Sequence, residues 1–154
     1  MPAYFLDSSA LVKAYRQEIG TRWVQQLLSP AAANDSYVAR ICGAEVVAAI
    51  VRQQRLGNLS SSDAQAAISA FKRDLAGKFR IVATASSVIN EAMRLIETHA
   101  LRGYDGVQLG AAMRIHHARS AALLPALTFL SADQKLNAAA SAEGLSVDDP
   151  NLHP

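Results

Sequence analysis

Short apolar segments separated by longer stretches with helical periodicity constrain the fold of this chain more than any other feature. Residues 2–6, 79–83 and 126–130 are clear strand candidates, and residues 35–39 and 145–147 are weaker ones. The stretches between them place apolar residues at the 3.6-residue spacing of an α-helix. Strands that alternate with helices form a mostly parallel sheet with helices on both faces. The sequence therefore predicts a three-layer α/β/α sandwich.

The boundaries of the predicted helices follow from cap and stop signals. Ser8 and Ser9 can cap the first helix, and Ser60 with Asp63 resembles a capping box. Ser131 and the glutamine three residues later form a second capping-box pattern. Helices are expected at 10–15, 21–28, 41–54, 61–77, 84–100, 104–119 and from about 134 to 142.

Length and composition indicate a single folded domain over residues 1–154. Hydrophobic residues make up 51% and charged residues 18% of the chain, which excludes the composition of a disordered protein. The longest uncharged stretch, 120–132, is shorter than the roughly 20 residues of a membrane span. The N-terminus lacks the basic region of a signal peptide, and one cysteine excludes an internal disulfide. These features predict a cytoplasmic protein.

Four acidic residues stand out because of their positions in this pattern. Asp7 and Asp133 follow predicted strands, and in open α/β sheets ligands bind beyond the carboxyl ends of the strands. Glu45 and Asp105 each share a helix face with apolar residues. Charged side chains are rarely buried unless they are paired or bind a metal ion. The four acids are therefore candidates for a common site.

Each acid also has a structural explanation. The three aspartates could cap helices or favour their first turns, and Glu45 could pair with Arg40 or Arg52. Carboxylates that converge repel one another, however, so a cluster of four needs a cation or raised pKa values. Because the chain has no cysteine or histidine cluster, ligation by oxygen alone points to Mg²⁺ or Mn²⁺.

The basic residues leave the choice of partner open. Eleven of the fifteen are arginine, which suits bidentate contacts with phosphate, yet the formal net charge is only +2. Composition thus permits a nucleic-acid partner without requiring one. The sequence has neither a serine-hydrolase elbow nor a glycine-rich phosphate loop.

Around these acids the sequence resembles PIN-domain nucleases, and among them the VapC-like toxins of bacterial toxin–antitoxin pairs. The resemblance covers nearly the whole chain. It rests on four short segments that each contain one acid: YFLDSSALVK (4–13), GAEVVAA (43–49), LRGYDGVQL (101–109) and FLSAD (129–133). Each segment is short, but together they place four acids in the family's order.

The resemblance implies roles for individual residues. Asp7, Glu45, Asp105 and Asp133 match the family's catalytic, metal-binding acids. Their supporting hydroxyls are expected from Ser9 and Ser131.

The resemblance leaves the roles of three further residues less defined. Some members carry a fifth acid after the last strand, where Asp148 and Asp149 lie, but Asp149 with Pro150 also fits a turn, so both interpretations stay open. Gln108 occupies a position where many members have histidine, and little consequence for the metal site is expected.

The resemblance further implies an endoribonuclease that needs Mg²⁺ or Mn²⁺ and hydrolyses RNA phosphodiester bonds. A basic rim would deliver RNA to the acidic pocket. Its candidates are Arg16, Arg40, Arg52, Arg55 and Arg102.

The family also implies protein partners, namely a VapB-like antitoxin and a second copy of the chain in a homodimer. Apolar helix residues such as Trp23, Leu27, Ile50 and Phe71 could form an interface or belong to the core.

Three alternatives remain. The chain could be a PIN-fold nuclease that acts in RNA processing or on structured DNA, or a non-catalytic module of the same fold that binds RNA or protein. A phosphotransfer or receiver-type domain also gathers acids at strand ends, but it would place two acids together near the N-terminus, where this chain has Asp7 alone.

Overall fold

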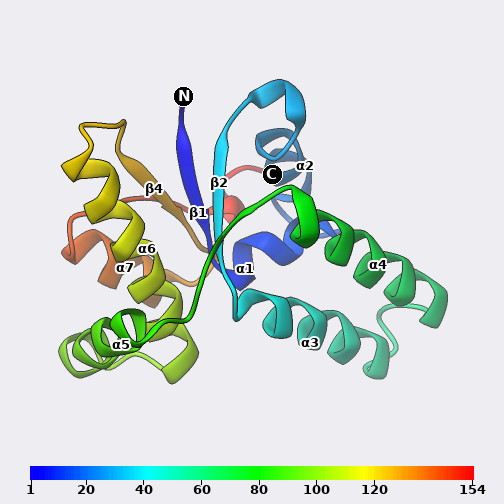
Figure 1. The fold of residues 1–154 in the computed structure, drawn as a ribbon. Coiled ribbons are helices and arrows are strands. Elements are labelled where there is room, and N and C mark those ends of the chain that lie inside the picture. Colours follow the sequence, from blue (N-terminus) through cyan, green and yellow to red (C-terminus); the bar gives the residue numbers. More distant parts are fainter.

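The computed structural model describes all 154 residues and has a central sheet of five strands. Every neighbouring pair of strands is parallel, and the order is β3-β2-β1-β4-β5 (Figure 1). The strands are β1 Ala3–Leu6, β2 Asp35–Ala39, β3 Arg80–Val82, β4 Leu127–Leu130 and β5 Ser146–Asp148. The predicted fold class is confirmed, and the sheet is parallel throughout.

Seven α-helices cover the two faces of the sheet (Figure 1). One face carries α1 Ser8–Leu11, α2 Thr21–Leu27, α3 Cys42–Arg55 and α4 Ser61–Gly77. The other carries α5 Ser86–His99, α6 Gly103–Ala121 and α7 Gln134–Ala142. Short 3₁₀ segments lie at η1 Val12–Ala14, η2 Pro30–Ala32 and η3 Pro150–Leu152. None of the helices is both long and apolar enough to cross a membrane.

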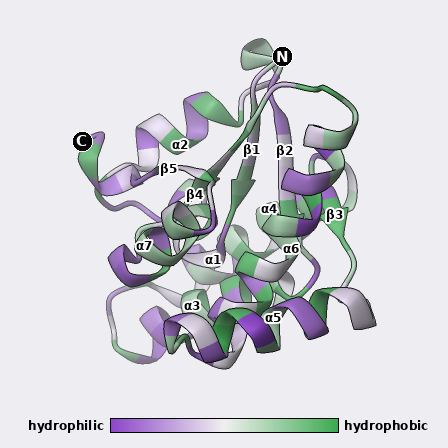
Figure 2. Ribbon diagram, turned by 90° about the vertical axis from the view of Figure 1, so that its left-hand side faces the viewer, coloured by the Kyte–Doolittle hydropathy of each residue, from purple (hydrophilic) through white to green (hydrophobic).

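The central strands β1 and β4 are largely apolar because each face of the sheet borders a separate hydrophobic core. Successive residues of a strand point to opposite faces, so Phe5 joins the core under α5–α7 while Leu6 joins the core under α1–α4. Phe5 and Phe129 stack on neighbouring strands with ring centroids 5.8 Å apart. The helices are amphipathic, as the alternating hydropathy colours along α5 illustrate (Figure 2).

Several apolar residues considered for an interface belong to these cores. Leu27, Ile50 and Phe71 are buried between the helices and the sheet. Trp23 is half-buried and stacks on His153 with ring centroids 4.0 Å apart. These side chains therefore stabilise the monomer.

Two predicted helix caps are wrong, because an aspartate caps each of these helices in place of a serine, although α7 begins at Gln134 as predicted. α1 begins at Ser8, where Asp7 rather than a serine is the N-cap, and it changes to a 3₁₀ turn after Leu11. α7 is capped by the Asp133 carboxylate, which accepts hydrogen bonds from the backbone N–H groups of the second and third helical residues. The Ser131 hydroxyl does not cap α7, because its oxygen accepts from the backbone N–H of Asp133, which precedes the helix, while it donates to Asp7.

The C-terminal segment packs against α2 and η1 through close contacts. Gly20 has a left-handed φ of 86°, and a Cβ atom there would lie 2.3 Å from the carbonyl oxygen of Pro150. Lys13, a buried lysine that the sequence did not single out, donates hydrogen bonds to the Ile19 carbonyl at 2.8 Å and to Asn151 Oδ1 at 2.9 Å. Residues 149–153 are thereby held against the N-terminal quarter of the chain.

This packing predicts that Gly20→Ala destabilises the protein more than the same change at Gly57. Both glycines have positive φ, but a Cβ at Gly57 meets nothing within 4 Å. Backbone strain alone should cost Gly57→Ala about 1–2 kcal/mol, and the clash with Pro150 should add to that at Gly20. Urea unfolding of both variants measures the difference. Equal losses of unfolding free energy in the two variants would show that the C-terminal segment can move away from the added methyl group at no cost in stability.

Candidate active site

The four predicted acids lie around one open pocket of about 410 Å³ at the carboxyl edge of the sheet. The strand order reverses between β1 and β4, and this is the position where open α/β sheets bind ligands. Asp7 and Asp133 come from the ends of these two strands, while Glu45 and Asp105 come from the first turns of α3 and α6. The pocket lining also includes Ser8, Ser9, Arg52, Arg102 and Gln108.

Asp7 is the most enclosed of the four acids. Its side chain accepts hydrogen bonds from the Ala10 backbone at 3.0 Å, from the Ser9 hydroxyl at 2.8 Å and from the Ser131 hydroxyl at 2.9 Å. Burial, with a smaller contribution from the charge of Asp105, raises the pKa of Asp7 to about 7, because these hydrogen bonds only partly offset the loss of water. Asp7 has no cationic partner among the side chains of the protein.

Ser9 and Ser131 both contact Asp7 and also join the ends of β1 and β4. The Ser9 hydroxyl oxygen accepts from the backbone N–H of Ala132 at 2.9 Å, and that of Ser131 accepts from the backbone N–H of Asp133 at 3.0 Å. The two hydroxyls lie 3.2 Å apart. They hold the Asp7 carboxylate in one orientation.

Glu45 is held by polar side chains instead of an arginine. Its Oε1 accepts from the Ser8 hydroxyl at 2.8 Å and from Gln108 Nε2 at 2.6 Å. The alternative that it pairs with Arg40 or Arg52 is therefore wrong. Gln108 is buried, lines the pocket and also donates to Ser8, so its side chain is part of the site.

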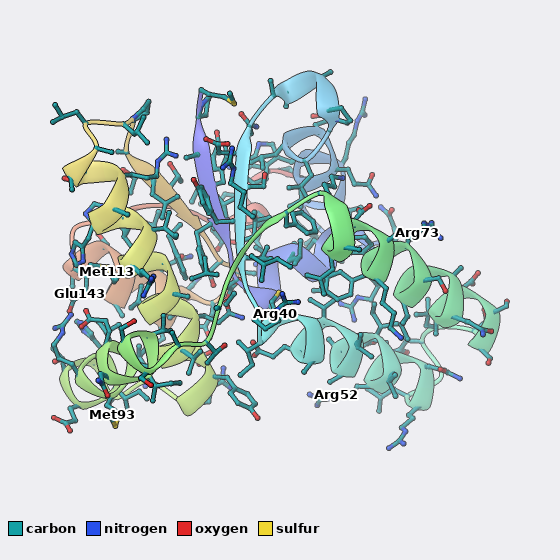
Figure 3. All side chains as sticks on the ribbon, in the orientation of Figure 1. Arg40, Arg52, Arg73, Met93, Met113 and Glu143 are labelled. Carbon is teal, nitrogen blue, oxygen red and sulfur yellow. The ribbon has the colours of Figure 1, made fainter.

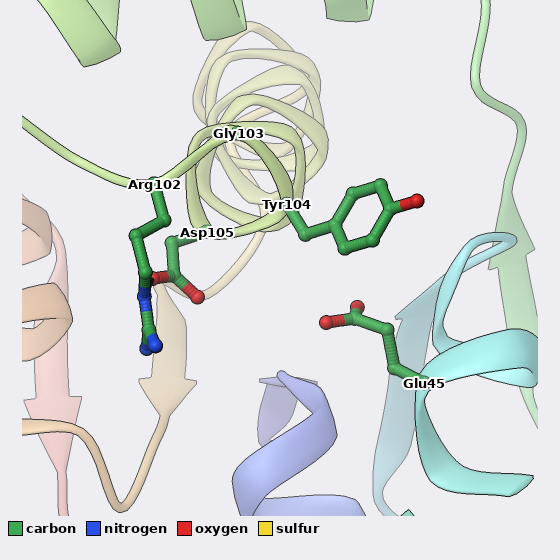
Figure 4. Close-up of a pocket in the computed structure, with 5 residues that line it drawn as sticks. All are labelled: Glu45, Arg102, Gly103, Tyr104 and Asp105. Atoms are coloured by element: carbon green, nitrogen blue, oxygen red, sulfur yellow. Dashed lines mark hydrogen bonds and ion pairs between the residues drawn. The ribbon is translucent and has the colours of Figure 1, made fainter. Parts of the chain in front are cut away.

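Arg102 bridges the remaining two acids. Its Nε donates to Asp105 at 2.9 Å, and a terminal nitrogen donates to Asp133 at 3.3 Å. The side chain is 81% exposed, so water screens these ion pairs and they hold the acids only weakly. Figure 4 shows Arg102 beside Asp105, with Glu45 across the pocket.

The donor set of this site fits a hard divalent cation. The pocket offers carboxylate and hydroxyl oxygens, which Mg²⁺ and Mn²⁺ prefer, and it contains a buried carboxylate without a cationic partner. With the side chains as they stand, no three acidic, histidine or cysteine side chains are close enough together to hold one ion. The guanidinium of Arg102 takes the bridging position between Asp105 and Asp133.

The structure brings only some of the other candidate residues to the pocket. Arg52 and Arg102 line it, and Arg16 lines an adjoining pocket. Arg40 and Arg55 are exposed and line neither of these two pockets (Figure 3 labels Arg40 and Arg52).

The two C-terminal acids are also separate from the pocket. Asp148 Oδ1 lies 2.9 Å from His153 Nε2, and the Asp149 side chain caps η3. The turn interpretation of Asp149 and Pro150 therefore describes this segment, and neither acid lines the site.

Known proteins resemble the chain in sequence. The sequence model of the PIN domain family matches residues 4–141. Ribonuclease VapC45 and ribonuclease VapC49, from two strains of Mycobacterium tuberculosis, are each 30% identical to the chain over 154 residues, which is the full length of both proteins compared.

Solved structures share the fold at lower sequence identity. FitAcB from Neisseria gonorrhoeae has a TM-score of 0.65 at 17% identity, and the match covers 96% of this chain and 97% of that chain. VapC20 from Mycobacterium tuberculosis, described as a toxin that cleaves the sarcin–ricin loop, has a TM-score of 0.60 at 13% identity over 98% and 99% of the two chains. The chain belongs to the PIN domain family, in which its full-length relatives are VapC ribonucleases.

Proposed function

We propose that the protein is a divalent-metal-dependent endoribonuclease and the toxin of a VapBC-type toxin–antitoxin pair. Full-length similarity to VapC ribonucleases supports RNA as the substrate. The observation that carries the catalytic part is that the buried Asp7 and three other acids line one pocket at the point where the strand order reverses. Such a reaction takes place where RNA is available, which agrees with the cytoplasmic location expected from the sequence.

The residues that would hold the metal are Asp7, Glu45, Asp105 and Asp133. A bound Mg²⁺ or Mn²⁺ supplies positive charge that stabilises a phosphodiester during cleavage and makes a nearby water molecule more acidic. Asp7 is suited to this role because Ser9 and Ser131 fix its orientation, and because a cation would offset the cost of ionising it in a buried place.

Other residues of the chain prepare the site for a phosphate. Gln108 and Ser8 orient Glu45, so that its second carboxylate oxygen is free of these two bonds. Arg102 pairs with Asp105 and Asp133 and also brings an exposed positive charge to the rim. A guanidinium in this position can turn from the acids to a phosphate oxygen, which it binds with the same geometry.

An antitoxin partner is part of the proposal. Structures of similar fold include a toxin–antitoxin complex from Klebsiella pneumoniae and VapBC2 from Rickettsia felis bound to a DNA fragment from their promoter. A cationic side chain of such a partner can occupy the acidic pocket as Arg102 does here. The homodimer stays a prediction, and Leu27, Ile50 and Phe71 are not available to form it because they are core residues.

The first prediction is that Asp7→Asn lowers RNA cleavage by at least about 100-fold, since loss of a metal ligand exceeds the effect of losing an outer-shell partner. The assay incubates purified protein, freed of any partner, with total RNA in Mg²⁺, Mn²⁺ or EDTA. Asp63→Asn is the matched control, because Asp63 is an exposed first-turn acid on α4 outside the pocket. Cleavage by Asp7→Asn at the wild-type rate would refute the site.

Absence of cleavage by the wild type would direct attention to the alternatives. A toxin arrests growth when it is expressed and is rescued by its antitoxin, whereas an RNA-processing nuclease cuts RNA without arresting growth. A non-catalytic module would bind RNA or protein and cut nothing in any metal.

A second prediction concerns the stability of the fold against pH. The pKa of Asp7 is raised from 3.8 to about 7 in the folded protein, so folding disfavours its ionised form. The stability that the neutral carboxyl provides is complete below about pH 4 and is lost as the pH rises towards 7. Asp7→Asn should therefore be more stable than the wild type at pH 8, by up to about 4 kcal/mol, and the difference should vanish near pH 4.

Urea unfolding of both proteins at several pH values measures this difference, and Mn²⁺ provides an internal control. Mn²⁺ should raise the urea concentration at the midpoint of unfolding for the wild type at pH 8 and have little effect on Asp7→Asn. The reason is that an ion that binds only the folded state stabilises that state. If the wild type were more stable than Asp7→Asn at pH 8 without metal, the conclusion that burial disfavours the ionised form of Asp7 would be wrong.

A further inference from the structure

Three neighbouring pockets share lining residues at the carboxyl edge of the sheet, and together they are called the trough. The central pocket contains the four acids, and it shares Glu45, Arg102 and Asp105 with a pocket of about 390 Å³ on one side. On the other side it shares Ser9 and Arg52, among others, with a pocket that also contains Arg16. The acids thus lie in the middle of the trough, with an arm extending from each side.

The first arm presents an unusual aromatic side chain. Tyr104 is 63% exposed, and it is the only aromatic residue of the chain in the exposed class, since all others are buried or half-buried. Its hydroxyl has no hydrogen-bond partner in the protein. Figure 4 shows the ring extending from the first turn of α6 towards the Glu45 side of the pocket, away from Arg102. Neither packing nor a polar contact accounts for this exposed ring.

The second arm presents an unpaired cation. Arg52 is exposed on α3 and forms no ion pair or side-chain hydrogen bond, whereas Arg16 in the same arm is paired with Glu18 at 3.0 Å. Lys13 at the floor of this arm is engaged with Ile19, Glu18 and Asn151. Arg52 is therefore the cation of this arm that is free to receive an anion.

We propose that Tyr104 and Arg52 bind the RNA on opposite sides of the cleaved bond by different chemistry. Tyr104 stacks against one nucleobase, and Arg52 binds a backbone phosphate beyond the acids. This inference rests on the proposed ribonuclease function and adds two subsites to it. A base can reach the ring only when it is released from its own stack, so the nucleotide on the Tyr104 side is unpaired in the bound RNA.

The two contacts differ in their dependence on salt. Stacking of a base on an aromatic ring involves no release of counterions, and its loss on alanine substitution weakens binding by about 5- to 100-fold. A phosphate contact releases counterions, so each one contributes about 0.7 to the slope of log affinity against log salt for a single strand. The salt slope therefore separates the two arms.

The experiment measures RNA binding by full-length protein that carries Asp7→Asn, so that the RNA stays intact in Mg²⁺. The probe is a short fluorescein-labelled single-stranded RNA of mixed sequence, and its anisotropy is recorded at salt concentrations from about 50 to 200 mM. Tyr104→Ala is compared with Tyr104→Phe, which keeps the ring. Arg52→Ala is compared with Arg73→Ala, which removes an exposed arginine of α4 outside the trough (Figure 3).

Tyr104→Ala should weaken binding about tenfold without changing the salt slope, and Tyr104→Phe should bind as the parent does. Arg52→Ala should weaken binding and reduce the slope by about 0.7, and Arg73→Ala should leave the slope unchanged. In the active protein Tyr104→Ala should raise KM more than it lowers kcat. Unchanged thermal unfolding of the variants shows that the fold is intact.

Two outcomes would overturn the inference, and they can be told apart. If the wild type cleaves RNA but Tyr104→Ala binds like Tyr104→Phe, or Arg52→Ala keeps the parent slope, the subsites are wrong and the ribonuclease function stands. If the wild type cleaves no RNA and the parent binds none, both the subsites and the proposed function are refuted.

Discussion

The burial of one carboxylate, that of Asp7, is the constraint on which the arrangement of the site depends. Asp7 caps α1, accepts hydrogen bonds from two serine hydroxyls and lies where β1 and β4 end side by side. Its environment fixes its position but raises its pKa to about 7, so the fold tolerates an acid that it does not fully stabilise. A shifted pKa of this kind is typical of groups that bind a ligand or take part in catalysis.

The parallel sheet explains why such a group is found here. Reversal of the strand order leaves an opening between the helix layers, which the first turns of α3 and α6 flank with Glu45 and Asp105. Both hydrophobic cores lie beneath this edge, so they support the site without contributing to its chemistry. The rigid part of the molecule thus carries the acids, and the exposed side chains of Arg52, Arg102 and Tyr104 surround them.

The sequence predicted the strands well because both faces of a covered sheet must be apolar. It predicted helix caps poorly at Ser8, Ser9 and Ser131, since a serine near a strand end can cap a helix or bond a neighbouring acid, and only the spatial position of Asp7 decides between them. The contacts of Gln108 could not be predicted, because its partners Ser8 and Glu45 lie far away in the chain. Which arginines line the pocket also could not be predicted, because this depends on the shape of the folded surface.

The docking of the C-terminal segment on α2 and η1 brings the end of the chain to one arm of the trough. The PIN domain pattern ends at residue 141, yet Asn151 lines the same arm of the trough as Arg52 and binds the buried Lys13. Gly20 allows the backbone of Pro150 to approach closely enough for this wall to form. A substitution in the C-terminal segment can therefore alter the wall of this arm while the four acids stay in place.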